Sequence, residues 1–243
     1  MAENEFIFGR HSVLAAIKAE KRKINKIYIS EKNSFSDEIY FEADKRNIQV
    51  ISADKDKISA LTKAKNHQGI AADVGLLPFL DFDEFLNSKI FQNKFAVILD
   101  SLEDPLNLGS IARSALCLGA DVLIIPKDRS VRPTPFASKI SAGALEYIPL
   151  IVQTNIVNTI KDLKTNGFWI GGLDGDGSDT IENSSITPPF ALVVGSEGKG
   201  IRPLVRKNLD FVFKIEQTGP VTSLNASSAA AIGIYECAKK IKF

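Results

Sequence analysis

Residues 191–200 read Ala191-Leu192-Val193-Val194-Gly195-Ser196-Glu197-Gly198-Lys199-Gly200, an apolar run that ends in small and polar residues. A second apolar run, Phe211 to Ile215, leads to another polar loop, which ends Thr222-Ser223-Leu224-Asn225-Ala226-Ser227-Ser228. We interpret each run as a buried strand whose loop leads into a helix. In α/β proteins, ligands bind where the carboxyl ends of strands open into such loops. The two loops therefore predict one shared pocket built largely from backbone groups.

Residues 94–243 alternate between apolar runs and helical patterns. The apolar runs cover residues 95–99, 122–125, 148–152, 168–170, 190–194 and 211–215. The helical patterns cover residues 108–118, 136–145, 155–167 and the stretch from 225 onward. Runs that are apolar on both faces are typical of parallel strands covered by helices. The pattern predicts a parallel, doubly wound α/β domain in which Asn107 is the N-cap of the first helix.

A smaller α/β unit is predicted before it. Its strands cover residues 6–8, 24–29, 48–51 and 69–74, and its helices cover residues 12–19, 36–46 and 54–64. A unit of about seventy residues is within the size range that folds alone. The irregular residues between the two units predict a linker with one short helix. The predicted organisation is thus a domain at 1–75, a linker at 76–93 and a domain at 94–243.

The charge of the chain is nearly balanced. A net charge of +1 gives no global field that attracts a polyanion, so an RNA partner would need local basic clusters. Lys18, Lys21, Arg22 and Lys23 form one such cluster. The residues alone leave two interpretations open, a solvated helix-to-strand turn or a contact with RNA phosphates.

Neither a metal site nor a membrane segment is expected. His11 and His67 lie far apart, and Cys117 and Cys237 have no zinc or disulfide spacing. The first residues are acidic, unlike a secretion signal, and no apolar run approaches the roughly 20 residues that span a bilayer. A reducing, cytoplasmic compartment is therefore expected.

Common nucleotide and hydrolase signatures are missing. The glycines at 195, 198 and 200 do not follow the dinucleotide spacing, and Lys199 precedes a glycine where a P-loop needs serine or threonine. Neither histidine lies in the second domain, which leaves no Ser-His-Asp arrangement there. What remains is a pocket of glycines and hydroxyls with Glu197 and Arg113. Arg113, on an otherwise apolar helix, predicts either a bound anion or a salt bridge with Glu103 or Glu197.

Three motifs in order carry a family resemblance: Asn107-x-Gly109-x-x-x-Arg113, Val194 to Gly200, and Ser223 to Ser227. They resemble the motifs of the SpoU/TrmH 2'-O-ribose RNA methyltransferases. Further counterparts are Phe8-Gly9-Arg10-His11, His67-Gln68-Gly69-Ile70, Lys127-Asp128-Arg129-Ser130 and Ser141-Ala142-Gly143-Ala144. The resemblance spans the whole chain and fits best the bacterial 23S rRNA guanosine 2'-O-methyltransferases.

This resemblance implies a fold and a reaction. The second domain is expected to be a trefoil-knotted SPOUT methyltransferase domain, and the first an L30e-like RNA-binding domain. The resemblance also implies a homodimer whose active site forms at the subunit interface. The implied reaction transfers a methyl group from S-adenosylmethionine to the 2'-hydroxyl of a guanosine ribose in 23S rRNA.

The resemblance also assigns residues. Gly172, Leu173, Gly195, Ile215 and Leu224 are expected at the cofactor, and Asn107, Arg113, Glu197, Ser223 and Asn225 at the reacting groups. Because a guanidinium stays protonated in proteins, Arg113 is assigned to positioning the substrate phosphate and 2'-hydroxyl and to stabilising charge. The expected RNA contacts are Lys18, Lys21, Arg22, Lys23, Lys127, Arg129 and Arg132.

One segment departs from the family pattern. Family members often have Ile-Pro-Met-x-Gly where this chain has Ile215-Glu216-Gln217-Thr218-Gly219, which predicts a looser adenine pocket with an added charge at Glu216. Two alternatives stay open. One is a tRNA ribose 2'-O-methyltransferase, and the other is a catalytically weak RNA-binding factor in ribosome assembly.

Overall fold

The computed structural model describes residues 4–31, 34–91, 94–128, 130–220 and 223–242. The chain divides into two compact units. One contains residues 1–78 together with 133–147, and the other contains residues 79–132 together with 148–243. We call them the N-terminal unit and the C-terminal unit.

The C-terminal unit is built on a six-stranded sheet in the order β10-β8-β9-β5-β6-β7. Its strands are β5 (Phe95–Asp100), β6 (Val122–Pro126), β7 (Leu150–Gln153), β8 (Trp169–Leu173), β9 (Phe190–Gly195) and β10 (Phe211–Phe213). All neighbouring strands are parallel. Every residue of the central strands β5 and β9 is buried, as the apolar runs require. The predicted parallel α/β domain is confirmed.

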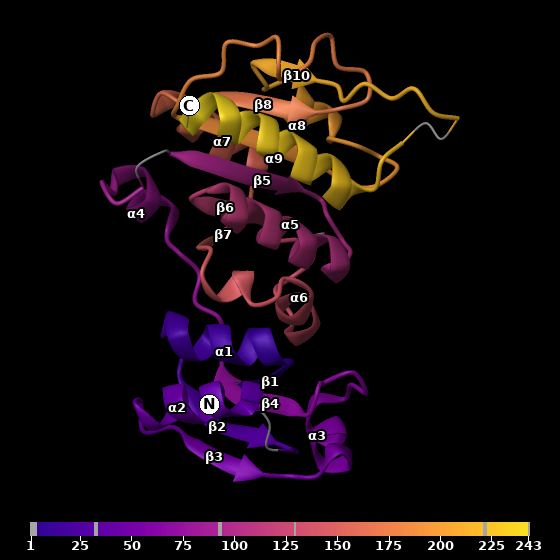
Figure 1. The fold of residues 1–243 in the computed structure, drawn as a ribbon. Helices are drawn as coiled ribbons and strands as arrows, with labels where there is room; N and C mark the ends of the chain where they lie inside the picture. The colour runs from indigo at the N-terminus through magenta and orange to yellow at the C-terminus, as the bar shows by residue number, and fades with distance from the viewer. Residues whose placement is uncertain (1–3, 32–33, 92–93, 129, 221–222, 243) are drawn as a thin grey trace. The chain divides into compact units, whose positions relative to one another are not determined.

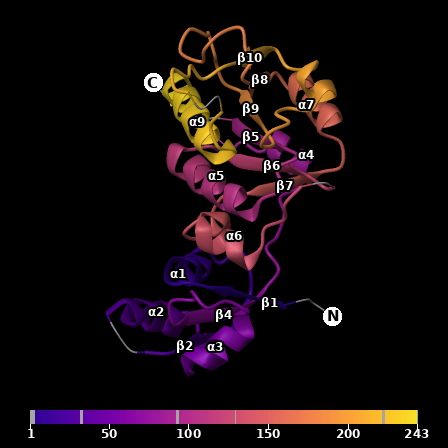
Figure 2. The ribbon, with the colours of Figure 1, turned by 90° about the vertical axis from the view of Figure 1, so that its right-hand side faces the viewer.

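Helices cover both faces of this sheet (Figure 1 and Figure 2). Helices α5 (Pro105–Leu118) and α9 (Ala226–Lys242) pack side by side on one face. Helices α4 (Phe82–Asn87) and α7 (Ile156–Thr165) cover the other, and the short α8 (Pro203–Arg206) adds Val205 to the core beneath them.

Helix α5 begins earlier than predicted. Asp104 is its N-cap, and its carboxylate accepts a hydrogen bond of 2.9 Å from the backbone N–H of Leu106. Pro105 follows at the first helical position, where its missing N–H costs nothing. Asn107 therefore lies inside the first turn rather than at the cap. The Asp-Pro pair determines the start because both residues favour it.

The stretch 76–93 is more than a linker. From Phe79 onward its described residues belong to the C-terminal unit, and α4 is the predicted short helix. Phe82 and Phe85 of α4 lie in the core that also holds α7. The backbone N–H of Leu80 donates a 2.8 Å hydrogen bond to the carbonyl of Leu150, the first residue of β7. Apolar burial thus fixes a segment whose irregular composition predicted a linker with one short helix.

The N-terminal unit has a mixed four-stranded sheet in the order β1-β4-β2-β3. Its strands are β1 (Asn4–Phe8), β2 (Ile24–Ile29), β3 (Gln49–Ser52) and β4 (Ile70–Gly75). Strand β4 is antiparallel to both neighbours, and β2 is parallel to β3. Helices α1 (Arg10–Ala19) and α2 (Ser34–Asp44) bury one face of the sheet, and α3 (Lys55–Thr62) buries the other.

Residues 133–147 complete this unit, although the sequence placed them in the second domain. They form α6 (Pro135–Ile140) and the 3-10 helix η1 (Ala144–Glu146), instead of one helix over 136–145. The break falls at Ala142 and Gly143, whose φ angles are 50° and 86°. A Cβ on Gly143 would lie 2.4 Å from Cβ of Ala15 in α1. The glycine thus permits the close packing of this segment on α1.

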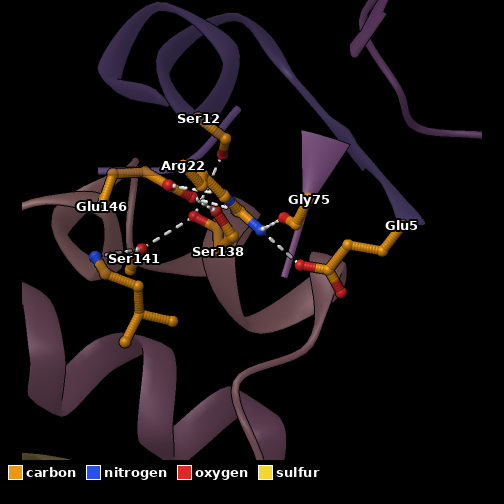
Figure 3. Close-up of polar contacts among 8 residues, drawn as sticks. Glu5, Ser12, Arg22, Gly75, Ser138, Ser141 and Glu146 are labelled. Carbon is orange, nitrogen blue, oxygen red and sulfur yellow. Dashed lines mark hydrogen bonds and ion pairs between the residues drawn. The ribbon is translucent and has the colours of Figure 1, made fainter. Parts of the chain in front are cut away.

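A buried ion pair fastens the segment to the unit (Figure 3). Arg22 donates from Nε and Nη2 to the two carboxylate oxygens of Glu146, at 2.9 and 2.5 Å. Its Nη1 lies 2.5 Å from the carboxylate of Glu5. The side chains of Arg22 and Glu146 are 3% and 1% exposed. Arg22 is therefore withdrawn from the predicted RNA contacts, since a buried guanidinium with two carboxylate partners is not presented to a polyanion.

Serine hydroxyls complete the surroundings of Glu146. Ser138 donates from Oγ to the Glu146 carboxylate at 3.0 Å, and the Ser138 carbonyl accepts from Oγ of Ser12 at 3.0 Å and of Ser141 at 2.7 Å. These bonds connect α1, α6 and η1. Since buried charges need such partners, the segment and residues 1–78 stabilise each other.

Replacing Glu146 by alanine should strongly destabilise the N-terminal unit. The change leaves the buried Arg22 with the carboxylate of Glu5 and the carbonyl of Gly75 as its described partners, and removing one partner of a buried pair costs about 3–5 kcal/mol. The free energy of unfolding is measured by urea denaturation. Glu38→Ala is the matched control, because it breaks an ion pair with Lys18 whose side chains are 39% and 43% exposed. Equal losses in the two variants would contradict the structural role of the buried pair.

Candidate functional site

A cavity of about 520 Å³ opens at the carboxyl ends of β8, β9 and β10. Among its lining residues are the predicted Leu173, Gly195, Ile215, Ser223 and Leu224. The two loops singled out in the sequence therefore do share one pocket. Its walls combine apolar side chains with backbone groups, and its volume suits a small organic ligand.

Gly172 does not line this cavity. A Cβ at this position would lie 2.4 Å from Leu209 and 2.6 Å from Ile201. The glycine lets the side chains of Leu209 and Ile201 pack closely on β8, and it directly precedes the lining residue Leu173.

The loop after β9 is closed on itself by backbone contacts. The Ser196 N–H donates to Gly200 at 3.1 Å, and the Gly200 N–H donates to Ser196 at 3.0 Å. A Cβ on Gly195 would lie 2.2 Å from the carbonyl carbon of Gly200. Gly198 and Gly200 have φ angles of 76° and 61°, a region that favours glycine. The spacing of these glycines is therefore set by the turn.

A fully buried carboxylate anchors the end of the same loop. Asp100, the last residue of β5, accepts a 2.9 Å hydrogen bond from the backbone N–H of Arg202. The carboxylate also accepts a 2.7 Å hydrogen bond from Nε of the same arginine. Asp100 is the direct sheet neighbour of Gly195. The ion pair thus holds both ends of the loop against the sheet.

Three predicted residues form one polar network beside the cavity. Asn107 donates from Nδ2 to Oε1 of Glu197 at 3.1 Å. Asn225 donates from Nδ2 to the same Glu197 oxygen and to Oδ1 of Asn107, the latter at 3.2 Å. The network brings together α5, the loop after β9 and the start of α9. Since both amides donate to it, the Glu197 carboxylate is held in a fixed orientation.

Asn225 has a second role as the N-cap of α9. Its Oδ1 accepts hydrogen bonds from the backbone N–H of Ser227 at 2.8 Å and from the hydroxyl of Ser227 at 2.5 Å. One side chain thus satisfies the helix start with its oxygen and orients Glu197 with its nitrogen. The sequence predicted the start of the helix at Asn225, but not that its side-chain oxygen and nitrogen have separate roles.

Arg113 lies outside the network. It is exposed on α5, and it has no ion pair with Glu103, Glu197 or any other residue that the structure describes. The salt-bridge interpretation within one chain is therefore wrong for the described residues. The guanidinium is free to meet an anion or a second chain.

The cavity also has charged residues that the sequence did not indicate. Asp174 and Arg206 line it, and Oδ2 of Asp174 lies 2.5 Å from Nη1 of Arg206. The N–H directions do not favour a hydrogen bond at Nη1, so the contact is an ion pair. Asp174 directly follows β8, and this position at the end of a strand is the sequence feature that could have identified it as a site residue. Arg206 lies in the four-residue α8, which is too short for a periodic pattern.

The predicted basic residues differ in availability. Lys18 pairs with Glu38, and Lys21 donates to the backbone carbonyl of Tyr147. Lys23 and Lys127 are exposed, while Arg132 is half-buried and donates to the carbonyl of Lys127 at 2.5 Å. Arg129 lies outside the described residues. Several of these cations are thus engaged within the chain.

Two family models match the chain. Residues 94–235 match the SpoU rRNA methylase family, and residues 6–79 match the family described as RNA 2'-O ribose methyltransferase substrate binding. A protein of Staphylococcus saprophyticus assigned to the TrmH family of tRNA/rRNA methyltransferases is 42% identical over 242 residues, which are 98% of this chain and 96% of the relative. A Staphylococcus haemolyticus relative with the same description is 41% identical over 243 residues.

Solved structures share the fold. The SpoU methyltransferase AviRb from Streptomyces viridochromogenes has a TM-score of 0.81 at 20% identity, covering 98% of this chain and 89% of AviRb. An AdoMet-bound rRNA methyltransferase from Sinorhizobium meliloti has a TM-score of 0.80 at 20% identity, covering 99% of this chain and 88% of that one.

Fold and site thus define an RNA methyltransferase with a separate substrate-binding domain. The chain belongs to the SpoU/TrmH family, and the resemblance carried by the three motifs is confirmed. Within the described residues, no helix has the length and apolar character to cross a membrane. The same residues contain no group of three or more side chains suited to hold a metal ion.

Replacing Asn225 by alanine should lower the stability of the C-terminal unit by about 1 kcal/mol, because the cap of α9 is lost. It should also free Glu197 from one of its two amide donors. The melting temperature measures the first effect. Ser228→Ala is the control, since Ser228 is exposed in the first turn of α9 and its side chain does not cap the helix. A cap role is excluded if both variants melt alike.

Proposed function

We propose that the protein transfers a methyl group from S-adenosylmethionine to the 2'-hydroxyl of a guanosine ribose in 23S rRNA. We further propose that it acts as a cytoplasmic homodimer with a trefoil-knotted C-terminal unit. The observation that carries the reaction is the glycine-built cavity directly beside the Asn107–Glu197–Asn225 network. In a member of a family of RNA methyltransferases, this places a pocket for a small ligand next to a carboxylate of fixed orientation.

The cavity suits the cofactor. Leu173, Ile215 and Leu224 offer apolar surface for an adenine, and the loop around Gly195 offers backbone groups. S-adenosylmethionine supplies an activated methyl group whose sulfonium leaving group departs as a neutral thioether. The protein therefore needs little acid catalysis, and its residues chiefly have to orient the acceptor hydroxyl and favour loss of its proton.

The segment that departs from the family pattern lies partly in the cavity. Gln217 lines it, whereas Glu216 is exposed and is not among the lining residues. The amide of Gln217 adds hydrogen-bonding capacity where many family members have methionine, and the exposed carboxylate of Glu216 adds charge outside the pocket. This arrangement supports cofactor binding in a cavity whose wall differs from the family pattern at Gln217. It gives no specific support to the alternative of a catalytically weak RNA-binding factor.

Arg113 supports a site shared between two chains. The catalytic network within one chain is made of carboxylate and amide groups, and the exposed Arg113 stands apart from it. An isologous dimer would place the Arg113 of each chain where the other chain needs it. There it would position a substrate phosphate and stabilise developing charge on the 2'-oxygen.

The N-terminal unit favours rRNA over tRNA as the substrate. The tRNA-modifying TrmH/SpoU enzyme of A. aeolicus covers only 65% of this chain, whereas the rRNA methyltransferase of S. meliloti covers 99%. The relatives described as tRNA/rRNA methyltransferases keep tRNA as the second candidate.

Incubation with unmodified 23S rRNA and labelled S-adenosylmethionine should place the label on one guanosine 2'-oxygen. The modified nucleotide is mapped by primer extension at low nucleotide concentration, and total tRNA is the parallel substrate. Label on tRNA alone would select the second candidate. Label on a base would refute the reaction class.

Two inactive variants should complement each other when their chains are mixed. Arg113→Ala should keep cofactor affinity and lose most transfer, whereas Gly195→Ala should lose cofactor affinity because its Cβ collides with Gly200. A mixed dimer then has one intact site, so a random mixture should recover about a quarter of the wild-type rate. Cofactor affinity is measured by calorimetry, and transfer by incorporated label. No recovery despite exchanged chains would show that each site is built from a single chain.

A further inference from the structure

A second cavity, of about 540 Å³, lies in the N-terminal unit. It opens where the carboxyl ends of β1, β2 and β3 meet, and its walls come from the start of α1, from α3 and from the loop before β4. We call it the α1–α3 cavity. None of the residues assigned to the methyltransferase site contributes to it.

The charged residues that line the α1–α3 cavity are mostly cations. Arg10, Lys55 and Lys65 line it, and Glu31 is the one carboxylate among the lining residues that the structure describes. The pair between Lys55 and Glu31 is exposed, at 64% and 65% of the two side chains, so it is weak and easily exchanged. The excess of positive charge in a concave wall predicts an anionic ligand.

Arg10 is the most informative of these cations. Its Nε is buried and has no hydrogen-bond partner among the described residues. The ion pairs of the described residues do not include it either. Its guanidinium carbon lies 5.4 Å from the ring centre of Phe35, which fixes its orientation. A buried N–H group without a partner is rare in folded proteins, and an anion in the cavity would supply the acceptor that this group lacks.

The floor of the cavity is rigid and polar. Gly69 has a φ of 73°, a region that favours glycine, and a Cβ there would lie 2.4 Å from Oγ of Ser30. Gln68, with a φ of 58°, accepts a 3.0 Å hydrogen bond from the backbone N–H of Arg10. The motif His67-Gln68-Gly69-Ile70, noted in the sequence without a role, thus builds the floor beneath the cations.

His67 belongs to this floor as a neutral ring. Its Nδ1 accepts from the Gly69 N–H at 3.0 Å, which leaves Nε2 to donate to Ser59 at 3.0 Å. Burial lowers the pKa of His67, a hydrogen bond with the backbone of Lys55 opposes this shift, and the charge of Lys139 lowers the pKa further. The ring is thus a fixed structural part of the wall, and the ligand charge is met by Arg10, Lys55 and Lys65.

We propose that the α1–α3 cavity binds the sugar–phosphate backbone of the RNA substrate, with Arg10, Lys55 and Lys65 on phosphate oxygens. The inference rests on an RNA substrate, as proposed above, but not on which nucleotide is methylated. The cavity lies within the residues that match the substrate-binding family. Ser30, Ser59 and Gln68 add neutral hydrogen-bonding groups suited to ribose hydroxyls. The predicted cluster at residues 18–23, by contrast, is partly engaged within the chain.

The test compares Lys55→Gln and Lys65→Gln with Lys57→Gln in the full-length protein. Lys57 is exposed on the same helix as Lys55 but does not line the cavity, so it controls for net charge. Binding to in vitro transcribed 23S rRNA is measured by filter binding over a series of salt concentrations. Each cavity variant should lose about five- to tenfold in affinity near 0.1 M salt, with a salt slope reduced by about 0.7–0.9. Lys57→Gln should keep the wild-type slope.

Equal effects of Lys55→Gln and Lys57→Gln would overturn the proposal, because a general charge effect would then suffice. Binding of inorganic phosphate is measured for the same variants. If the cavity variants lose phosphate binding but bind RNA like the wild type, the proposal is also overturned, and the cavity is a site for small anions. Methyl transfer gives an independent readout. The KM for RNA should rise in the cavity variants while kcat at saturating RNA stays unchanged.

The same experiment separates the two proposals. If wild-type protein binds 23S rRNA through the cavity but does not methylate it, the cavity stands and the proposed reaction on that RNA fails. If the wild type methylates it and the cavity variants bind like Lys57→Gln, only the cavity fails. Arg10→Gln is a further cavity variant for the same binding measurement. It is used if its melting temperature matches that of the wild type, which shows that it folds.

Discussion

The C-terminal site depends on the close approach of two stretches of backbone at Gly195 and Gly200. A single methyl group at residue 195 would lie 2.2 Å from the Gly200 carbonyl carbon. The approach turns the chain back at the end of β9 and leaves Glu197 at the tip of the turn, within reach of Asn107 and Asn225. It also clears space for a ligand at the carboxyl ends of three strands. Backbone geometry, rather than a reactive side chain, thus sets up this site, and a reaction that needs alignment more than acid catalysis suits it.

Much of this arrangement was predictable from local sequence. The runs that became β5 and β9 are apolar on both faces, and this alone requires a sheet covered on two sides. The strand-to-loop transitions located the cavity, and Gly195 and Leu224 line it as expected. Glycine spacing and helix caps depend on residues that are close together in the sequence, so motifs of this kind can be predicted before the fold is known.

The remaining features come from contacts between distant residues. Arg22 looked like part of a surface cluster, but its partner Glu146 lies 124 residues further along the chain. Gly172 resembled a ligand-binding glycine, and only the positions of Leu209 and Ile201 show that it serves packing. Asp100 and Arg202 are likewise separated by 102 residues. No local pattern distinguishes a charge that meets solvent from one that meets a buried partner, because the partner is chosen by the tertiary fold.

The path of residues 133–147 has a consequence for the order in which the protein is made. The chain enters the C-terminal unit at residue 79, returns to finish the N-terminal unit, and then continues into β7. Domains of a growing chain generally fold as they emerge from the ribosome, the N-terminal one first. Here residues 1–78 emerge with Arg22 still lacking its main counter-charge, and the unit reaches its final packing only after Glu146 has left the exit tunnel. By then β5, α5 and β6 are already outside, so part of the C-terminal unit is exposed before the N-terminal unit is complete.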